Sequence, residues 1–397
     1  MSQLAETEHR VTPLELFFDL VFVFGFTEVT TLLREDPTWH GLGRGLLALT
    51  VLWWAWASYA WLTNALDADR GPVLAAMLVA TSAMFLAALA VPDAFGDDRF
   101  LFAVSFVLVL GMFVVLYGLG ARGVPDLRAA VLRTTPWAVA GGILVLTGAF
   151  VGSEARPWLW LLAVVAGFLG PLLTPVDGWR VHPAHFAERH GLIIIIAVGE
   201  SLVAIGLSAR STGLGAAVLV AVLLGLAIAA SMWLAYFDFF AIAVQQLLVR
   251  RQGAERVRLA RDAYSYLHLP MIVGIVVSAF ALRVAVEHPH ARLETVPAVC
   301  LCLGSSVYLL GYLGIQLLVA RRLTVGRPAA ALAFAAILPA VLAVPALAAL
   351  ALCLAVWSAL HAWELIGWRE ARAVRRAGGI PEDELRRVRR SARAETR

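Results

Sequence analysis

Residues 14–26 read LELFFDLVFVFGF, an apolar run interrupted only by Glu15 and Asp19. Similar runs recur along the 397-residue chain, in which 61% of the residues are hydrophobic and 15% are charged. Soluble domains carry about 25% charged residues, so this composition is typical of a chain whose solvent is lipid. Because backbone amides find no water inside a bilayer, such runs must be helical. The sequence therefore predicts an all-α fold, a polytopic transmembrane helical bundle.

Ten apolar runs are long enough to cross a hydrocarbon core, which takes about 17 to 25 helical residues. They start near Leu14, Gly43, Pro72, Phe100, Val131, Pro157, Glu188, Leu214, Tyr266 and Val296. The stretch 328–363 is too long for one span, and Pro339 and Pro345 divide it into two short helices. The prediction is therefore twelve spans, with eleven as the alternative.

Residues 1–366 form the predicted membrane domain, and residues 367–397 form a basic cytoplasmic tail. Placing both termini in the cytoplasm puts 25 arginines inside and 7 outside, as the positive-inside rule requires. The N-terminus has no basic segment before the first apolar run, so we expect no cleaved signal peptide. The expected location is the inner (plasma) membrane.

Short motifs recur in the same order in the two parts of the chain. The clearest pair is WASY at residues 56–59 and WLAY at residues 233–236. Two six-helix repeats in parallel orientation, residues 1–180 and 181–366, would explain this order, and such repeats are common in transporters.

The partners that composition predicts are lipids. Five arginines lie in the expected loop 241–262 and more follow in the tail. They can bind anionic lipid headgroups, or act only as topology anchors. Tryptophans such as Trp53, Trp54, Trp158, Trp160 and Trp363 are expected to anchor the chain at the membrane interface. The basic residues are no signal of a nucleic-acid partner, and nothing in the sequence indicates an oligomeric state.

Charged residues inside a span cost several kcal/mol unless they are paired, so they are candidate functional residues. Helical spacing puts Glu15 and Asp19 on one face of the first span and Glu28 on roughly the opposite face from Glu15. Glu15 also fits a simpler role as a first-turn acid that complements the helix dipole. Asp19 is expected to line a polar interior.

The densest polar stretch is HPAHFAERHG at residues 182–191, followed by Gly199-Glu200-Ser201. Its candidates for a substrate or ion pathway are Glu188, Arg189, His190 and Glu200. Imidazole and carboxylate groups can also bind a divalent metal, and the residues for that alternative are His182, His185, Glu188 and His190. A third interpretation is an ion-paired helix cap. No other cofactor is predicted.

Two further candidates are Asp238 and His268, each near the expected inner end of its span. A histidine in this position can titrate near neutral pH, which would suit proton-coupled transport. A hydrogen-bonded core histidine is the alternative. The chain has no phosphate-binding Gly loop, no Gly-x-Ser-x-Gly elbow and no HExxH motif, which argues against a primary ATP-driven pump.

Three motifs resemble the bacterial low temperature requirement A (LtrA) family. They are residues 14–24, residues 185–192 running into Gly199-Glu200-Ser201, and residues 266–270 with Gly274. The residues that match the family's pattern are Glu15, Asp19, Glu188, Arg189, His190, Glu200 and His268. The resemblance implies a multi-pass membrane protein connected with growth in the cold, but it supplies no catalytic residues. Glu28 falls where other polar residues are usual in the family.

Three functions remain open on the sequence alone. The first is a secondary transporter or channel-like protein in which Glu200, with Asp19 and His268, lines a polar route. The second is a membrane-embedded enzyme acting on a lipid or isoprenoid through a His/Glu site at the cytoplasmic face. The third is a structural or regulatory membrane protein whose polar residues only pair helices.

Overall fold

The computed structural model describes residues 11–66, 71–238, 240–320 and 324–367, so the predicted basic tail lies outside the described residues except for its first position. Twelve helical stretches in the described part are long and apolar enough to cross a membrane. The first six are single helices, namely α1 (Pro13–Glu35), α2 (Trp39–Ala65), α3 (Gly71–Leu89), α4 (Arg99–Gly120), α5 (Pro125–Phe150) and α6 (Arg156–Leu173). The prediction of twelve spans is confirmed.

Three of the last six spans combine shorter helices. The elements are α7 (Pro183–Thr212), α8 (Ala216–Phe237), α9 (Phe240–Arg250), α10 (Gly253–Leu259), the π-helix η1 (Ala260–Tyr266), α11 (His268–Glu287), α12 (Thr295–Ala320), α13 (Gly326–Ala336), α14 (Leu338–Ala343) and α15 (Ala346–Gly367). The break between the last two spans falls at Val344 and Pro345, as the prolines predicted.

The segment 241–262 is helical except at residues 251–252, although the sequence analysis treated it as a loop. Helix α9 buries Phe240, Val244 and Leu248, which are four residues apart and therefore share one face. Its other positions are polar or partly exposed. One buried residue per turn holds this helix against the bundle. With 11 residues, α9 is too short to be a separate span.

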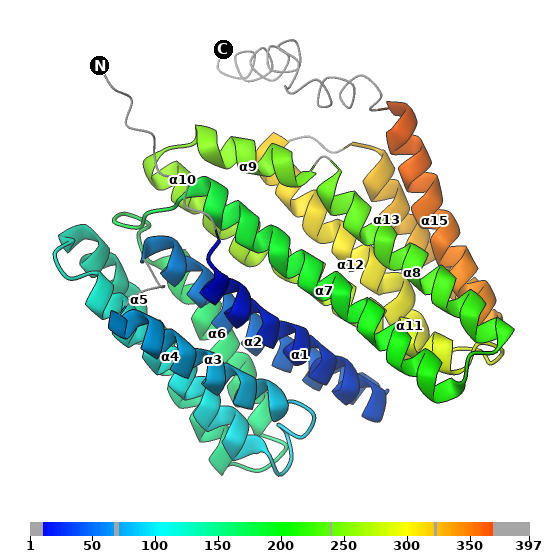
Figure 1. Cartoon of the computed structure of the whole chain (residues 1–397), viewed down its shortest axis with the longest axis horizontal. Helices are drawn as coiled ribbons and strands as arrows, with labels where there is room; N and C mark the ends of the chain where they lie inside the picture. The colour runs from blue at the N-terminus through cyan, green and yellow to red at the C-terminus, as the bar shows by residue number, and fades with distance from the viewer. Residues whose placement is uncertain (1–10, 67–70, 239, 321–323, 368–397) are drawn as a thin grey trace.

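Helices α1 and α7 lie side by side where the two parts of the chain meet (Figure 1). In Figure 1 helices α1 to α6, blue through cyan to blue-green, form one side of the bundle, and α7 to α15, green to orange, form the other. The two helices run in the same direction, because Asp19 pairs with Arg189 near their starts and Thr30 with Glu200 further along. Both start toward the side of the bundle where α15 ends (Figure 1), as an even number of spans requires.

The order of helix packing is similar in the two parts. In the first part, α1 packs on α2 and α3, α3 on α4, α4 on α5, α5 on α6, and α6 returns to α2. In the second part, α7 packs on α8 and α11, α11 on α12, α12 on α13, α13 on α15, and α15 returns to α8. The two six-helix repeats stay a prediction, and this shared order is what supports it.

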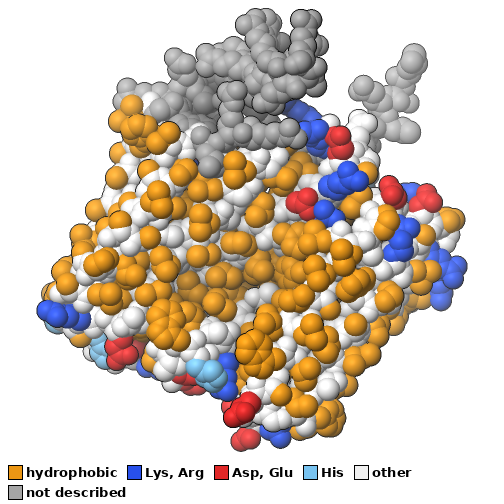
Figure 2. Space-filling view, turned by 180° about the vertical axis from the view of Figure 1, so that it is seen from behind, with side chains coloured by type: hydrophobic (Ala, Val, Ile, Leu, Met, Phe, Trp, Pro, Cys, Tyr) orange, Lys and Arg blue, Asp and Glu red, His pale blue; other side chains and the backbone are white. Residues whose placement is uncertain are grey.

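The surface carries a broad apolar band. Figure 2 shows hydrophobic side chains over most of one face, with charged side chains gathered toward its margins. Large apolar residues such as Phe150 (73% exposed) and Leu223 (64%) point outward from several spans. Exposed apolar area on this scale is stable only against lipid, so the chain is a multi-pass membrane protein.

The tryptophans only partly follow the expected interface role. Trp158 and Trp363 are exposed by 72% and 61%, which fits an anchor position. Trp53 and Trp160 are fully buried and Trp54 nearly so, so for these three residues the expectation was wrong. Their indoles fill the contacts between helices instead, as Gly141 and Gly167 make room for the Trp54 ring.

Close contact between α11 and α12 depends on glycine. A Cβ placed on Gly274 would lie 2.5 Å from the Gly304 carbonyl oxygen and 2.6 Å from the Tyr308 amide nitrogen. The backbones of the two helices therefore touch at this point, as small residues allow in membrane bundles. This contact fixes α11, which carries His268 into the bundle.

Candidate functional site

Polar side chains follow one another along the interface of α1, α7 and α11. We call the groups the Arg189 cluster (Glu15, Asp19, Trp56, Thr63, Asn64, His185 and Arg189), the histidine cluster (His190, Tyr236, Tyr264 and His268), the Glu200 centre (Thr27, Thr30 and Glu200) and the Glu287 cluster (Thr31, Arg34, Ser208, Arg283 and Glu287). On α1 they extend from Glu15 to Arg34, about 28 Å along the helix axis. This is close to the thickness of a hydrocarbon core.

The guanidinium of Arg189 is the centre of the first cluster. Its Nη2 donates to Asp19 Oδ1 at 2.6 Å, and its Nη1 donates to Thr63 Oγ1 at 2.6 Å and to Glu15 Oε1 at 3.4 Å. Asp19 Oδ1 also accepts from Trp56 Nε1 at 2.8 Å. The three charged side chains are at most 1% exposed. The ion pairs therefore join α1 to α7 in the interior of the bundle.

Glu15 has two roles in the structure. Its Oε2 accepts from the Thr12 amide at 2.9 Å and thereby closes a capping box at the start of α1. The same oxygen accepts from His185 Nε2 at 3.0 Å. The simpler sequence interpretation, a first-turn acid, is thus observed together with a buried contact to α7.

The hydrogen bonds of Asn64 assign the tautomer of His185. Asn64 Oδ1 accepts from the His182 amide and Asn64 Nδ2 donates to the His182 carbonyl, which fixes the orientation of the side-chain amide. Asn64 Nδ2 then donates to His185 Nδ1 at 3.1 Å, so the His185 proton is on Nε2 and points at Glu15. In this arrangement His185 is neutral, and one arginine faces two carboxyl groups.

Glu200 is fully buried in the middle of α7 and is bound by hydroxyl groups. Thr27 Oγ1 donates to its Oε2, and Thr30 Oγ1 donates to its Oε1 at 2.9 Å. The same two hydroxyls also lie within hydrogen-bond distance of carbonyls of their own helix, Val23 O at 3.0 Å and Thr27 O at 2.9 Å. A hydroxyl has one proton, so each threonine can bond either Glu200 or its own backbone.

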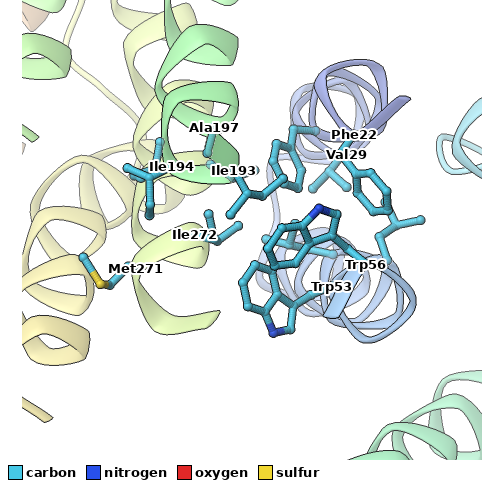
Figure 3. Close-up of a cluster of buried hydrophobic side chains, with 14 of the residues drawn as sticks. Phe22, Val29, Trp53, Trp56, Ile193, Ile194, Ala197, Met271 and Ile272 are labelled. Atoms are coloured by element: carbon cyan, nitrogen blue, oxygen red, sulfur yellow. The ribbon is translucent and has the colours of Figure 1, made fainter. Parts of the chain in front are cut away.

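An apolar layer separates Glu200 from the Arg189 cluster. Figure 3 shows Phe22 of α1, Trp53 of α2 and Ile193 of α7 meeting in this layer beside Ile272 of α11. The ring of Trp56 lies beside them, while its Nε1 belongs to the Arg189 cluster. All five are at most 1% exposed. On α7 the layer fills most of the eleven residues from Arg189 to Glu200, about 16 Å of helix. In this conformation the polar groups on its two sides are not in contact.

The Glu287 cluster lies beyond Glu200, toward the ends of α1, α7 and α11. Arg34 Nε donates to Glu287 Oε1 at 3.0 Å, and Ser208 Oγ donates to the same oxygen at 3.1 Å. Arg283 Nε is 3.6 Å from it. Arg34 is 45% exposed, so this cluster reaches the surface, while Glu200 does not.

The histidine cluster joins α7, α8, the π-helix η1 and the start of α11. His190 Nδ1 donates to the Phe186 carbonyl at 2.8 Å, and His268 Nδ1 donates to the Ala263 carbonyl at 2.8 Å. Tyr236 Oη donates to His268 Nε2 at 2.9 Å. The imidazole rings are 5.4 Å apart between centroids, and the Tyr264 ring is 4.9 Å from each.

Several residues predicted from the sequence lie away from these groups. Glu188 is exposed and accepts from the Val11 amide at 3.4 Å, so it does not share the buried face of His185 and Arg189. Asp238 caps the end of α8 and is half-buried. His182 is the exposed N-cap of α7.

The residues proposed for a metal do not meet. His182 and Glu188 are exposed, whereas His185 and His190 are buried and have different partners. In the described part of the chain, no three His, Cys, Asp or Glu side chains are grouped so that they could hold a metal ion. The geometry of the described residues therefore gives the metal alternative no support.

Sequence reasoning did not identify the partners of these residues. Thr27 and Thr30 follow one another at a spacing of three residues in the first span, which places both hydroxyls on one helix face, and this was a usable signal for Glu200. Tyr236 and Tyr264 carried no comparable signal, because tyrosines in apolar runs are ordinarily core residues.

A cavity of about 130 Å³ lies beside the π-helix, between α2, α5 and α6. Its walls are mainly aromatic, with Trp54, Trp61, Trp137 and Trp179 among them, and Arg261 and Ser265 supply polar atoms. None of the pathway candidates predicted from the sequence lines it.

Comparisons with known proteins agree with the motifs. A family model described as "Bacterial low temperature requirement A protein (LtrA)" matches residues 10–362. An uncharacterised protein of Rhizobium meliloti (strain 1021) is 26% identical over 298 residues, which is 70% of this chain and 69% of that protein. No solved structure matches the chain. Because the family match covers most of the chain and includes the residues of the site, the chain belongs to the bacterial low temperature requirement A family.

Proposed function

We propose that this protein is a secondary transporter or channel-like protein in which Glu200 is the ion-binding or proton-binding carboxylate. The observation that carries the proposal is the Glu200 centre, a buried carboxylate that accepts from Thr27 and Thr30 and makes no ion pair with the described residues. A carboxylate that only joins helices is ordinarily paired with a cation, as Asp19 is with Arg189. Glu200 therefore has the environment of a carboxyl group that gains and loses a positive ion.

The threonines support this interpretation because they offer two sets of hydrogen bonds. When Glu200 is charged, both hydroxyls donate to it. When it has bound a proton or cation, the hydroxyls can donate to the Val23 and Thr27 carbonyls instead. The site can therefore change its charge without leaving a donor unpaired, which would cost about 1–3 kcal/mol.

The surroundings of Glu200 support an ion route that approaches Glu200 from the side of the Glu287 cluster and is closed on the side of the Arg189 cluster. The Glu287 cluster extends from the surface toward Glu200, whereas the apolar layer of Figure 3 separates Glu200 from the Arg189 cluster. Transport would require the contact of α1 with α7 to rearrange at this layer. The similar packing of the two parts of the chain is the arrangement in which such rocking occurs between repeats.

The proposal predicts that Glu200→Gln abolishes ion flux. The purified protein in liposomes, loaded with a pH-sensitive or sodium-sensitive dye, should move protons or sodium ions under an imposed gradient and membrane potential. Gln keeps the size of the side chain and its hydrogen bonds to hydroxyls but has no charge to neutralise a cation and no group that takes up a proton near neutral pH. Flux in the variant should fall by about 100-fold, to the level of protein-free liposomes.

Glu35→Gln is the matched control, because Glu35 is an exposed acid at the end of the same α1 helix. It should retain the wild-type flux. Wild-type protein that is folded and reconstituted but moves neither ion would contradict the proposal, and so would wild-type flux in Glu200→Gln.

A further inference from the structure

We propose that the coupling ion is a proton and that the histidine cluster is a second buried proton site, with His190 Nε2 as the acceptor. This inference rests on the proposed function and specifies its ion. It starts from two polar atoms with no hydrogen-bond partner among the described residues, His190 Nε2 and Tyr264 Oη, both fully inside the bundle.

The hydrogen bonds assign the protons of both imidazoles. A carbonyl oxygen can only accept, so Nδ1 carries the proton in His190 and in His268. In the neutral rings both Nε2 atoms are therefore acceptors. Tyr236 Oη donates to Nε2 of His268, whereas Nε2 of His190 is open to an incoming proton.

The π-helix η1 brings the Tyr264 ring against the imidazole ring of His268. Its wider turn bonds the Leu267 amide to the Asp262 carbonyl at 3.1 Å, five residues back. The Ala263 carbonyl is thereby left to accept from His268 Nδ1, also five residues away. Tyr264 and His268 then stack at 4.9 Å with an interplanar angle of 20°. Short π-helical turns of this kind are frequent at functional sites.

The groups around His190 suit a proton and not a metal cation. Tyr264 of η1 and His268 of α11 face the His190 ring. Trp53 and Trp56 face it from α2. Arg189 precedes His190 on α7 and pairs with Glu15 and Asp19 of α1, and His185 bonds Glu15 in the same cluster. Imidazoles and phenols pass protons. They lack the several oxygen ligands that replace the hydration shell of a sodium or potassium ion.

The Arg189 cluster gives this proton a destination. With His185 neutral, one guanidinium faces two carboxyl groups, and Asp19 Oδ2 is buried with no partner among the described residues. Trp56 connects this cluster to the histidines, because its Nε1 donates to Asp19 and its ring lies 4.9 Å from that of His190. Asp19 Oδ2, a buried acceptor with no described donor, is therefore the destination that the proposal assigns to the proton.

The experiment compares proton and sodium flux in liposomes that contain the full chain. His190→Gln removes the acceptor nitrogen and should lower proton flux by about tenfold or more. Tyr264→Phe keeps the ring stack and removes only a hydroxyl that has no described partner, so it should fold as the wild type does and lower proton flux by a smaller factor. His288→Gln, at an exposed position after α11, is the control and should leave the flux unchanged.

The outcomes distinguish this inference from the proposed function. Proton flux that depends on Glu200 and on His190, with no flux driven by a sodium gradient at constant pH, supports both. Sodium flux that depends on Glu200 and is indifferent to His190 and Tyr264 would overturn the inference and leave the proposed function standing. Flux of neither ion would overturn both. Wild-type proton flux in folded His190→Gln and Tyr264→Phe would overturn the inference alone.

Discussion

Replacing Arg189 by Met should destabilise the protein by about 3–5 kcal/mol, because it leaves two carboxyl groups buried without their cation. Met has a similar length and no charge, so the change removes the ion pairs to Glu15 and Asp19 and the bond to Thr63 while filling much of the space. The free energy of unfolding, measured by SDS titration in mixed micelles, should show this loss directly.

Two further variants separate charge from packing. Arg189→Met combined with Glu15→Gln and Asp19→Asn removes the unpaired charges and should recover much of the lost stability. Arg251→Met breaks an exposed pair with Glu255 and should cost less than about 1 kcal/mol. An Arg189→Met protein as stable as Arg251→Met would show that the cluster does not hold α1 against α7.

Gly274→Leu should have the second large effect, a destabilisation of about 3 kcal/mol. Any side chain at this position meets backbone atoms of α12, the Gly304 carbonyl oxygen and the Tyr308 amide nitrogen. Backbone atoms cannot turn aside as a side chain can, so α11 and α12 must move apart. The same SDS titration, with size-exclusion chromatography of the solubilised protein, would measure the effect.

Gly111→Leu is the matched control, because a Cβ on Gly111 in α4 has no neighbouring atom within 4 Å. It makes the same chemical change inside a span and should leave the unfolding transition nearly where it is. Equal stability of the two variants would mean that the contact of α11 with α12 has enough freedom to admit a side chain.

The spans were predictable because a bilayer imposes one length on every helix that crosses it. The division at Pro345 was predictable too, because the stretch was too long for one span and contained prolines that end a helix. Helix α9 was missed because the prediction relied on hydropathy. The helix buries only one residue per turn, such as Val244 and Leu248, and it ends in a segment rich in arginine, so hydropathy alone describes it as a loop.

The sequence indicated some of the buried polar residues but not their pairings, and their role in function stays a prediction. Asp19, Glu200 and His268 all lie at the buried interface, but each has different partners there. The partners come from other helices, and helical spacing relates only residues of the same helix. This is why Arg189 was predicted only as a pathway candidate, with an ion-paired helix cap as an alternative, whereas the structure pairs it with a residue 170 positions earlier.

That separation of 170 residues has a consequence for how the protein is made. At about 5–20 residues per second, α1 leaves the ribosome roughly ten to thirty seconds before α7. During this time Asp19 has no arginine, and an aspartate inside a nascent span opposes membrane insertion, at a cost that reaches about 2.5–3.5 kcal/mol at the span centre. We therefore expect α1 to stay close to the insertion machinery, or to insert late, until α7 has been made.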